Sequence, residues 1–221
     1  MRTLKLLTVL CAISVAAPAL ADPTGLVKWS QLPDMETGID YGSMINWAIA
    51  ADDFECTSPW PVVDVHWWGS YWEPEPGEPQ PIDGFIIRFL SDVVEGEFSH
   101  PGAVLYETCV LGNCNETFYG YSAYDDTNVY QYYTEIPAFD QVPGEIYWIS
   151  IQVVQGWDEP PYWGWHNSRD DFRDDAVQAL EPSWDWWDAN DSLAFELTVV
   201  PEPGLFALAA FGLLALIRRK R

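Results

Sequence analysis

The sequence has very little positive charge. Only 10 of its 221 residues are Lys or Arg, against 34 Asp or Glu. Glu202 is the only acid outside residues 22–200 and six of the basic residues also lie outside, so residues 22–200 hold 33 acids, four basic residues and a net charge of about −29. Such a charge repels nucleic acid and anionic membranes and attracts cations. The sequence therefore excludes nucleic-acid binding, and solubility in salty or extracellular surroundings is the simplest explanation of the acidity.

Histidine and cysteine are also scarce, with three and four residues respectively. Their positions match no zinc-ligand spacing, so we predict no metal site built from these side chains. Cys109 and Cys114 flank a Gly-Asn turn, which predicts a disulfide that closes a small loop in an oxidising compartment. Cys56 is then left as a buried thiol.

Familiar catalytic motifs are absent as well. The sequence contains no nucleophile elbow, no metalloprotease motif and no catalytic-cysteine context. Pairs of carboxylates, which glycoside hydrolysis requires, arise by chance in so acidic a chain. We therefore predict no catalytic residues and a protein that is not an enzyme, with an exported glycoside hydrolase-like enzyme as the least favoured alternative.

The first 21 residues have the pattern of a secretory signal peptide. Arg2 and Lys5 supply the positive start, and an apolar centre follows them. Ala19 and Ala21 supply the small-x-small site of a signal peptidase. Residues 1–21 are therefore predicted to be removed on export.

The end of the chain has three parts in order. The triplet Pro201, Glu202 and Pro203 is followed by an uncharged apolar run over residues 204–217. A helix of that length rises about 21 Å, which is less than the roughly 30 Å hydrocarbon core of a bilayer. The prolines disfavour helix and hold the triplet extended, a form that a protease can grip. Four cations that should stay cytoplasmic close the chain: Arg218, Arg219, Lys220 and Arg221.

This order resembles the PEP-CTERM sorting signal of bacterial exported proteins, over residues 201–221. The resemblance implies that an exosortase recognises the tail and removes it near the Pro-Glu-Pro triplet. It also implies that the protein meets the membrane only through this transient single transmembrane helix, and is then released or transferred to the cell surface. A plain C-terminal membrane anchor is the alternative.

Short segments with apolar residues at alternate positions dominate the part of the chain between the two ends. Alternation of this kind is typical of strands with one buried face. The segments are residues 44–50, 61–72, 84–90, 103–111, 129–136, 145–155, 163–166 and 193–200. Eight or nine short strands with turn residues between them predict an all-β fold, a single jelly-roll-like β-sandwich over residues 22–200. The most apolar segment, residues 145–155, is expected at its centre.

Three other segments lack this alternation. Residues 28–39 are predicted to be an extended N-terminal arm, and residues 113–128 a long loop or a weak hairpin. Residues 170–180 are the one helix that we predict, because acids lead the segment where the helix N-terminus is positive.

Several pieces of the chain together resemble an uncharacterised β-sandwich domain that recurs in exported PEP-CTERM proteins. These pieces are KWSQLPD, ADDFEC, VHWWGSYW, PGEIYWISI and YWGWHNS. The similarity spans most of residues 26–198. It implies the fold and the location, and it implies no activity.

Tryptophan is abundant, and all 13 lie between Trp29 and Trp187. Disordered chains are poor in such residues, so this domain folds. Sugar-binding sandwiches present flat aromatic faces to pyranose rings, and the candidates for that role are Trp68, Trp163 and Trp165. A further group is Trp184, Trp186 and Trp187. The alternative for each ring is packing in the core, because neighbouring residues of a strand point to opposite faces.

Acidic pairs supply the oxygen ligands that calcium needs. Asp52 with Asp53, Asp125 with Asp126, and the acids of residues 170–175 are candidates, but none matches a calcium-loop motif. Adjacent acids on a strand also point apart. We therefore assign no cofactor and leave calcium as an alternative.

These features predict an exported surface or extracellular-matrix protein with a structural or adhesive role. PEP-CTERM proteins are associated with biofilm matrix, so the resemblance implies that this protein works in or near exopolysaccharide. The expected partners are signal peptidase, an exosortase and extracellular polysaccharide. A dedicated carbohydrate-binding module is the first alternative.

Overall fold

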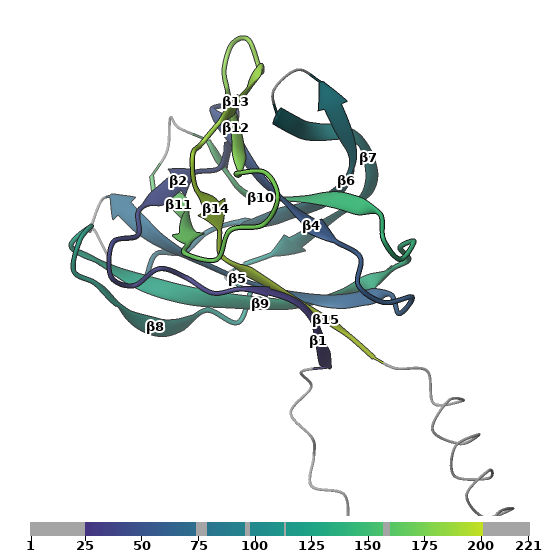
Figure 1. The fold of residues 1–221 in the computed structure, drawn as a ribbon. Coiled ribbons are helices and arrows are strands. Elements are labelled where there is room, and N and C mark those ends of the chain that lie inside the picture. The colour runs from purple at the N-terminus through teal and green to yellow at the C-terminus, as the bar shows by residue number, and fades with distance from the viewer. Residues whose placement is uncertain (1–24, 74–78, 96–97, 113, 157–159, 201–221) are drawn as a thin grey trace, which may run out of the picture.

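The computed structural model describes residues 25–73, 79–95, 98–112, 114–156 and 160–200, and over these ranges it consists of strands and their connections (Figure 1). The strands form two sheets, which confirms the prediction of an all-β, sandwich-like fold. The predicted signal peptide and sorting signal lie outside the described residues. Within the described part of the chain, no helix has the length and apolar character to cross a membrane.

The first sheet is organised around the long strand β5. Its hydrogen-bonded order is β1-β15-β5-β11-β14, with β2 paired to β11, and β9 joining β5 to β8. The strand bounds are β1 Leu26–Gln31, β2 Asp40–Gly42, β5 Val62–Glu73, β8 Thr117–Ser122, β9 Thr127–Phe139, β11 Tyr162–Ser168, β14 Ser192–Leu193 and β15 Phe195–Val199.

The second sheet has the order β13-β12-β4-β3-β10-β6-β7, with an additional pairing of β4 to β10. Its strands are β3 Met44–Ile45, β4 Ala48–Glu55, β6 Gly84–Glu95, β7 Phe98–Leu111, β10 Ile146–Gly156, β12 Val177–Leu180 and β13 Trp186–Asp188. Strand β10 lies between β4 and β6, which confirms the central position that its apolar sequence predicts.

The core between the sheets is built from aromatic rings. Trp67 of β5 stacks on Tyr132 of β9 with ring centroids 5.6 Å apart. Phe85 of β6, from the opposite sheet, meets Trp67 edge-on at 5.0 Å and Trp163 of β11 at 5.1 Å. Large rings in such tilted contacts stabilise a core beyond the area that they bury. Tryptophan thus fills the volume that Leu and Ile fill in most sandwiches.

Two local predictions are wrong. Residues 177–180 of the predicted helix are strand β12, which pairs with β4, and the positive φ of Arg173 interrupts any helix before it. The sheet ladder therefore overrides a weak local preference for helix. The predicted N-terminal arm contains β1, whose irregular register at Lys28 hides the alternation in the sequence.

One open alternative is decided in favour of the hairpin. Residues 117–122 form β8, which pairs with β9 through a tight connection at residues 123–126. The structure also has more strands than the eight or nine predicted, because short pieces such as β2, β3 and β14 are only two or three residues long. Such pieces are too short to show an alternating pattern.

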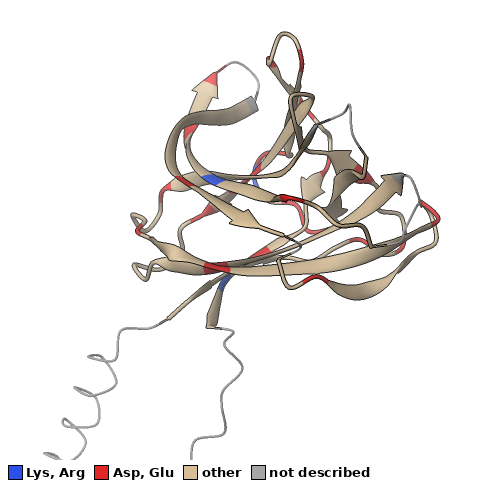
Figure 2. Cartoon of the chain, turned by 180° about the vertical axis from the view of Figure 1, so that it is seen from behind, with Lys and Arg blue, Asp and Glu red and all other residues tan. Residues whose placement is uncertain are grey.

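The charges lie around this aromatic core. Figure 2 shows Asp and Glu spread over strands and loops of both sheets, with Lys and Arg at few positions. Lys28 is one of these, and its ammonium donates to the carbonyl of Trp60 at 2.7 Å. Burial lowers the pKa of Lys28. The outer surface is therefore predominantly acidic, as the composition predicts.

Candidate functional site

The three tryptophans predicted to stack on sugars are core residues. Trp68 is 2% exposed, and Trp163 and Trp165 are fully buried. The indole nitrogen of Trp163 donates to Tyr132 at 3.2 Å, and that of Trp165 donates to the carbonyl of Ala194 at 2.8 Å. A ring without an exposed face cannot stack on a sugar, so the sugar-binding prediction is wrong for these residues. Trp163 and Trp165 face the other sheet, while Trp68 is covered from outside.

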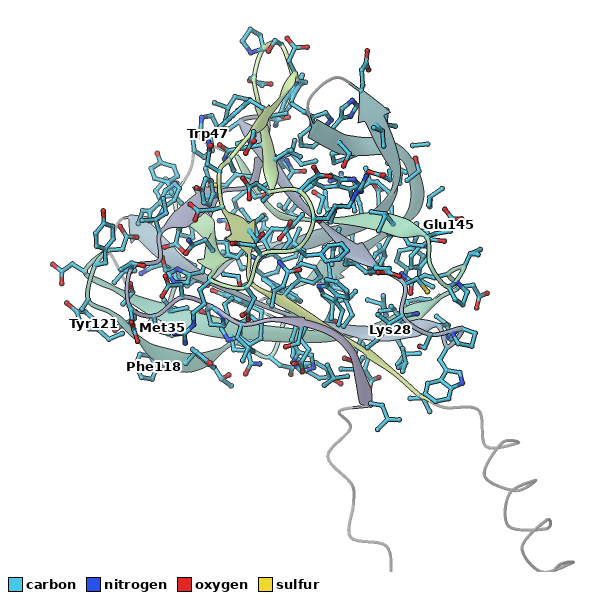
Figure 3. All side chains as sticks on the ribbon, in the orientation of Figure 1. Lys28, Met35, Trp47, Phe118, Tyr121 and Glu145 are labelled. Carbon is cyan, nitrogen blue, oxygen red and sulfur yellow. The ribbon has the colours of Figure 1, made fainter. Side chains whose placement is uncertain are left out.

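Exposed rings lie instead on the β8–β9 hairpin. Phe118 is 62% exposed, Tyr119 43%, Tyr121 53% and Tyr124 67%. We call these four residues the aromatic strip. Figure 3 shows Phe118 and Tyr121 at the same end of the molecule, with their side chains at its periphery. Four rings are thus exposed within seven residues, although Phe118 and Tyr119 lie on opposite faces of the sheet, against Tyr130 of the core and Trp68 of the outer cluster respectively.

The core side chains beneath the strip hold it in place. Strand β8 pairs only with β9 among the described strands, so it is a sheet edge. Its register shifts between Phe118 and Gly120, as at a β-bulge. Tyr119 packs edge-on against Trp68 at 5.6 Å, and Phe118 packs edge-on against Tyr130 at 6.1 Å. The predicted sugar-binding residue Trp68 therefore supports an exposed ring rather than a ligand.

Two carboxylates near the hairpin accept hydrogen bonds from tyrosine hydroxyls, one from the strip and one from the core. The Tyr121 hydroxyl donates to Asp126, and the Tyr132 hydroxyl donates to Glu116 at 3.3 Å. Hydroxyls and carboxylates beside flat apolar faces match the surface of a sugar, which has apolar C–H faces and a hydroxyl rim. The sequence signal that points here is the run from Phe118 to Tyr124, where aromatics occur without the regular alternation of a buried strand.

The second exposed aromatic group lies on the β12–β13 hairpin. Trp184 and Trp187 are about two-fifths exposed, whereas Trp186 packs on a small cluster around Trp148. The sequence prediction of an aromatic platform at these three residues thus places two of the rings at the surface. They are separate from the aromatic strip in the chain and in the sheet order.

Two adjacent acids of β4 have unusual environments. Asp52 accepts hydrogen bonds from the backbone N–H of Leu193 at 2.6 Å and from Gln31 Nε2 at 2.9 Å. Burial raises the pKa of Asp52 to about 7, although those hydrogen bonds oppose the shift. Burial, followed by the charge of Asp52, raises the pKa of Asp53 to about 9, against the opposing charge of Arg173.

Asp53 points to the outer face of the second sheet, where Arg173 covers it. Arg173 Nη1 lies 3.4 Å from Asp53 Oδ2 and 3.1 Å from Asp92 Oδ2. The Trp148 indole nitrogen donates to Asp92 Oδ1 at 2.8 Å. Oδ1 of Asp53 is buried with no hydrogen-bond partner in the described ranges. Asp53 is fully buried, and Arg173 lies between it and the solvent side of Asp92.

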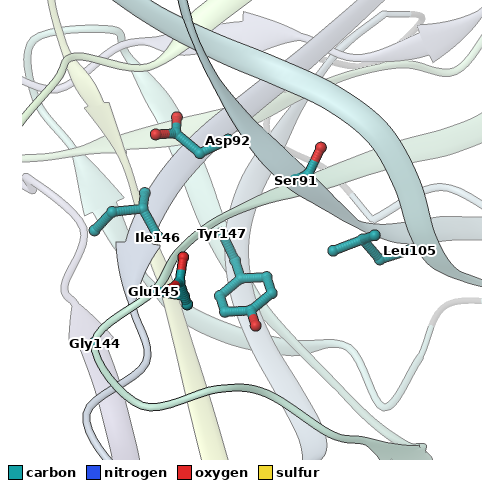
Figure 4. A pocket seen from close by; sticks show the side chains of 7 residues that line it. All are labelled: Ser91, Asp92, Leu105, Gly144, Glu145, Ile146 and Tyr147. Atoms are coloured by element: carbon teal, nitrogen blue, oxygen red, sulfur yellow. The ribbon is translucent and has the colours of Figure 1, made fainter.

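A pocket of about 380 Å³ lies beside this group, between β6, β7 and β10. In Figure 4 the Tyr147 ring lies between Glu145 and Leu105, and Asp92 lies at the far side of Ile146. The carboxylates of Asp92 and Glu145 line this pocket, so it would attract a cationic ligand and repel an anionic one. Seven residues line it: Ser91, Asp92, Leu105, Gly144, Glu145, Ile146 and Tyr147.

The predicted disulfide is not formed in the structure. Cys109 and Cys114 are free thiols, and so is the buried Cys56. Cys109 is exposed on β7, while Cys114 packs against the core and its thiol donates to the Gly112 carbonyl at 3.6 Å. Burial, followed by the nearby Cys109, raises the pKa of Cys114 to about 12.

The acidic pairs considered for calcium do not assemble into one centre. Across the described ranges, no group of three or more His, Cys, Asp or Glu residues is arranged to hold a metal ion. Asp52 and Asp53 point to opposite faces of β4, toward Gln31 and Arg173 respectively. This divergence follows from their adjacent positions on one strand.

The fold and its exposed hairpin define an acidic, aromatic-cored β-sandwich protein. The chain belongs to the family described as "Domain of unknown function (DUF7901)", whose model matches residues 27–210. The match runs from β1 to ten residues past Val200. No curated protein and no solved structure matches the chain.

Proposed function

We propose that this protein is an exported surface or extracellular-matrix protein that adheres to polysaccharide through the aromatic strip. The observation that carries the proposal is the exposure of four aromatic side chains within seven residues, between 43% and 67%, on one edge hairpin. Trp68 packs against Tyr119 and Tyr130 packs against Phe118, so these two rings are positioned before a ligand arrives. Such pre-organisation reduces the entropy that is lost on binding.

The charge around the strip narrows the class of glycan. Asp125 and Asp126 lie at the hairpin tip, and Glu116 lies just before β8. These acids repel uronic acids and sulfated sugars but accept hydrogen bonds from neutral hydroxyls. A neutral polysaccharide is therefore the proposed ligand class.

Substitution of the strip tests this function. The double change Phe118→Ala with Tyr121→Ala should weaken binding to a neutral polysaccharide about tenfold or more, roughly 1.4 kcal/mol, because two stacking faces are lost. Affinity electrophoresis of the full chain against a panel of neutral and acidic polysaccharides measures the effect. Trp187→Ala, on the other hairpin, is the control, and its ring is 41% exposed against 62% for Phe118 and 53% for Tyr121. Equal mobility of the double variant and the unmodified protein on every glycan would refute the proposal.

Sorting is the second part of the proposal. We propose that signal peptidase cuts after Ala21 and that an exosortase removes the tail near Pro201–Pro203, as the PEP-CTERM resemblance implies. The protein then lies in the cell envelope, at the cell surface or in the matrix. Support comes from the sequence of both ends, which lie outside the described residues.

Intact mass checks the sorting step. The protein recovered from outside the cell should lack both residues 1–21 and the four terminal cations. Glu202→Ala combined with Pro203→Ala should leave the tail attached and the protein cell-associated, because the extended triplet is lost. Recovery of extracellular protein that still ends in Arg221 would contradict the proposal.

A binding role also fits the acids of the second sheet better than catalysis does. The carboxyl group with the most raised pKa, Asp53, is covered by Arg173 and has no route to a substrate. We further propose that the sandwich has jelly-roll connectivity, for which the antiparallel pairing of nearly all its strands is the support.

A further inference from the structure

A buried histidine lies where strands β2 and β11 pair with each other. His166 of β11 is opposite Asp40 of β2 in the ladder, and neither side chain has any exposed surface. His166 Nδ1 lies 2.9 Å from Asp40 Oδ1, and its Nε2 lies 3.0 Å from the backbone carbonyl oxygen of Asp34. Both partners accept hydrogen bonds, so both ring nitrogens donate and the ring is an imidazolium. The fold therefore holds a buried cation between a carboxylate and a carbonyl.

The carbonyl of Asp34 begins a tight turn over residues 34–38. It also accepts a hydrogen bond from the backbone N–H of Gly38 at 3.1 Å, so the His166 ring is bonded to the point at which the turn closes. Gly38 permits this approach, because a Cβ at that position would lie 2.6 Å from His166 Nε2. Asn167 anchors the two ends of the turn: its carbonyl accepts from the N–H of Asp34, and its side-chain oxygen accepts from the N–H that follows the turn, both at 3.0 Å. Between these anchors the turn depends on the histidine.

The turn also positions Met35 beneath the aromatic strip. The Met35 side chain packs on the small cluster around Trp68, which supports the strip ring of Tyr119 at 5.6 Å. The terminal methyl of Met35 lies over the backbone of Gly120 in β8, where an added Cβ would come within 3.0 Å of it. Figure 3 shows Met35 at the same end of the molecule as Phe118. A change in the turn would therefore reach the strand that presents the strip.

We propose that His166 is a pH-sensitive latch: its imidazolium holds the turn over residues 34–38 closed and Met35 seated against β8, and loss of the ring proton as the pH rises loosens both. Neutral imidazole keeps one proton, which the carboxylate of Asp40 retains on Nδ1. Nε2 and the Asp34 carbonyl oxygen then face each other as two acceptors, and the bond that closes the turn is lost. The latch is a property of the fold, and only its effect on glycan binding rests on the proposed function.

The surroundings of the ring set the direction of the pH dependence. Burial by itself lowers the pKa of His166, but the hydrogen bond and charge of Asp40 and the hydrogen bond to the Asp34 carbonyl outweigh it, so the pKa is raised above its ordinary 6.5. A group whose pKa is raised on folding contributes stability that is complete below 6.5 and is lost as the pH rises through the raised value. The latch is therefore closed in acid and opens with rising pH.

The other groups around the ring do not reverse this direction. Asp125, in the β8–β9 connection, adds a negative charge that also raises the pKa of His166. Ser70 of β5 is neutral, and its hydroxyl donates to Asp40 Oδ2. The carboxylate of Asp34 accepts hydrogen bonds from groups of its own turn. Only the carbonyl of that residue is bonded to the ring.

Nuclear magnetic resonance of the ring nitrogens in the full chain follows the proton directly. His66→Gln and His100→Gln assign the signals of the other two histidines, so that of His166 is identified without altering the latch. Both nitrogens of His166 should carry protons at pH 6, and one proton should be lost at a midpoint above 6.5. Asp40→Asn keeps the shape but removes the charge, so it should lower this midpoint by about one pH unit or more.

Peroxide oxidation of Met35 reports whether the turn moves with the proton. Formation of the sulfoxide requires access to the thioether, so the oxidation rate of Met35 should rise about fivefold or more across the midpoint. Free methionine in the same solution corrects for the reagent, and the fully buried Met44 reports global unfolding. In Asp40→Asn the rise should move to the lower midpoint.

Asp140→Asn, at an exposed position between β9 and β10, is the control and should behave as the unmodified protein. A neutral His166 ring at pH 6, or a ring that titrates while the corrected rate at Met35 stays constant, would overturn the latch. Equal rises at Met35 and Met44 would mean global unfolding and would overturn it as well. A latch that opens in a protein that binds no polysaccharide would refute only the proposed function. Where glycan binding exists, it should weaken across the midpoint, and at a lower pH in Asp40→Asn.

Discussion

Trp163→Ala is expected to lower the free energy of unfolding by about 3 to 5 kcal/mol, the usual cost of deleting a large buried aromatic. Trp163 is fully buried between Phe85 and Tyr132, and its indole nitrogen donates to the Tyr132 hydroxyl. Its removal leaves a cavity and takes away the hydrogen bond that the Tyr132 hydroxyl accepts, while that hydroxyl still donates to Glu116. A loss of this size is a large part of the stability of an ordinary domain.

Denaturant unfolding of the full chain measures this loss. Trp163→Phe should cost less, because it keeps an aromatic ring and loses chiefly the indole N–H bond. Trp187→Ala should change stability by less than about 1 kcal/mol, since its ring is 41% exposed. Similar stability of Trp163→Ala and the unmodified protein would mean that Trp163 is not a core residue, and the sugar-stacking role would be open again.

The melting temperature should fall by roughly 15 °C or more between pH 5 and pH 8. Burial raises the pKa of Asp52 to about 7 and that of Asp53 to about 9, both from 3.8. A raised pKa means that the folded state holds the proton more tightly, so stability is greatest below pH 3.8 and is lost as the pH rises toward those values. In the folded state Asp53 keeps its proton over these three pH units, whereas in the unfolded state it is ionised. Its contribution alone lowers the free energy of unfolding by about 4 kcal/mol, at 1.36 kcal/mol per pH unit.

Differential scanning calorimetry at matched ionic strength measures how steeply the melting temperature falls with pH, and we call this the slope. Asp53→Asn carries no titratable proton and should reduce the slope by about half, leaving the contribution of Asp52. The control is Asp185→Asn at an exposed position of the β12–β13 hairpin, which should leave the slope unchanged. A melting temperature that rises from pH 5 to pH 8, or an unchanged slope in Asp53→Asn, would contradict the assignment of these protons.

The strands that the sequence identified are those with a clear burial pattern. Residues 145–155 have one apolar face and a second, partly apolar face, and β10 is in fact covered by neighbours on both edges. The helix predicted at residues 170–180 was wrong because acids at its start are equally suited to hydrogen bonds in a loop, where Asp174 accepts from Ser99. Only the pairing of β12 with β4 shows that this segment is a loop and a strand rather than a helix.

The candidate site was located only in part. The abundance of aromatic residues correctly indicates a folded domain in which some rings lie at the surface. The sequence does not show which tryptophans are buried and which are exposed. Trp68 and Tyr119 are neighbours in space and differ in exposure because β8 lies at the sheet edge while β5 lies inside it. Asp40 and His166 are each unremarkable in the sequence and meet only because β2 pairs with β11.

The sequence by itself determines the all-β class, the acidic surface and the aromatic core, because composition and alternation depend on local chemistry that needs no partner. The tertiary structure alone decides which rings are exposed, which acids keep their protons and which carboxylate meets His166. Exposure and pKa depend on the side chains of neighbouring strands. Residues far apart in the chain, such as His166 and Asp40, which are 126 positions apart, come together only on folding.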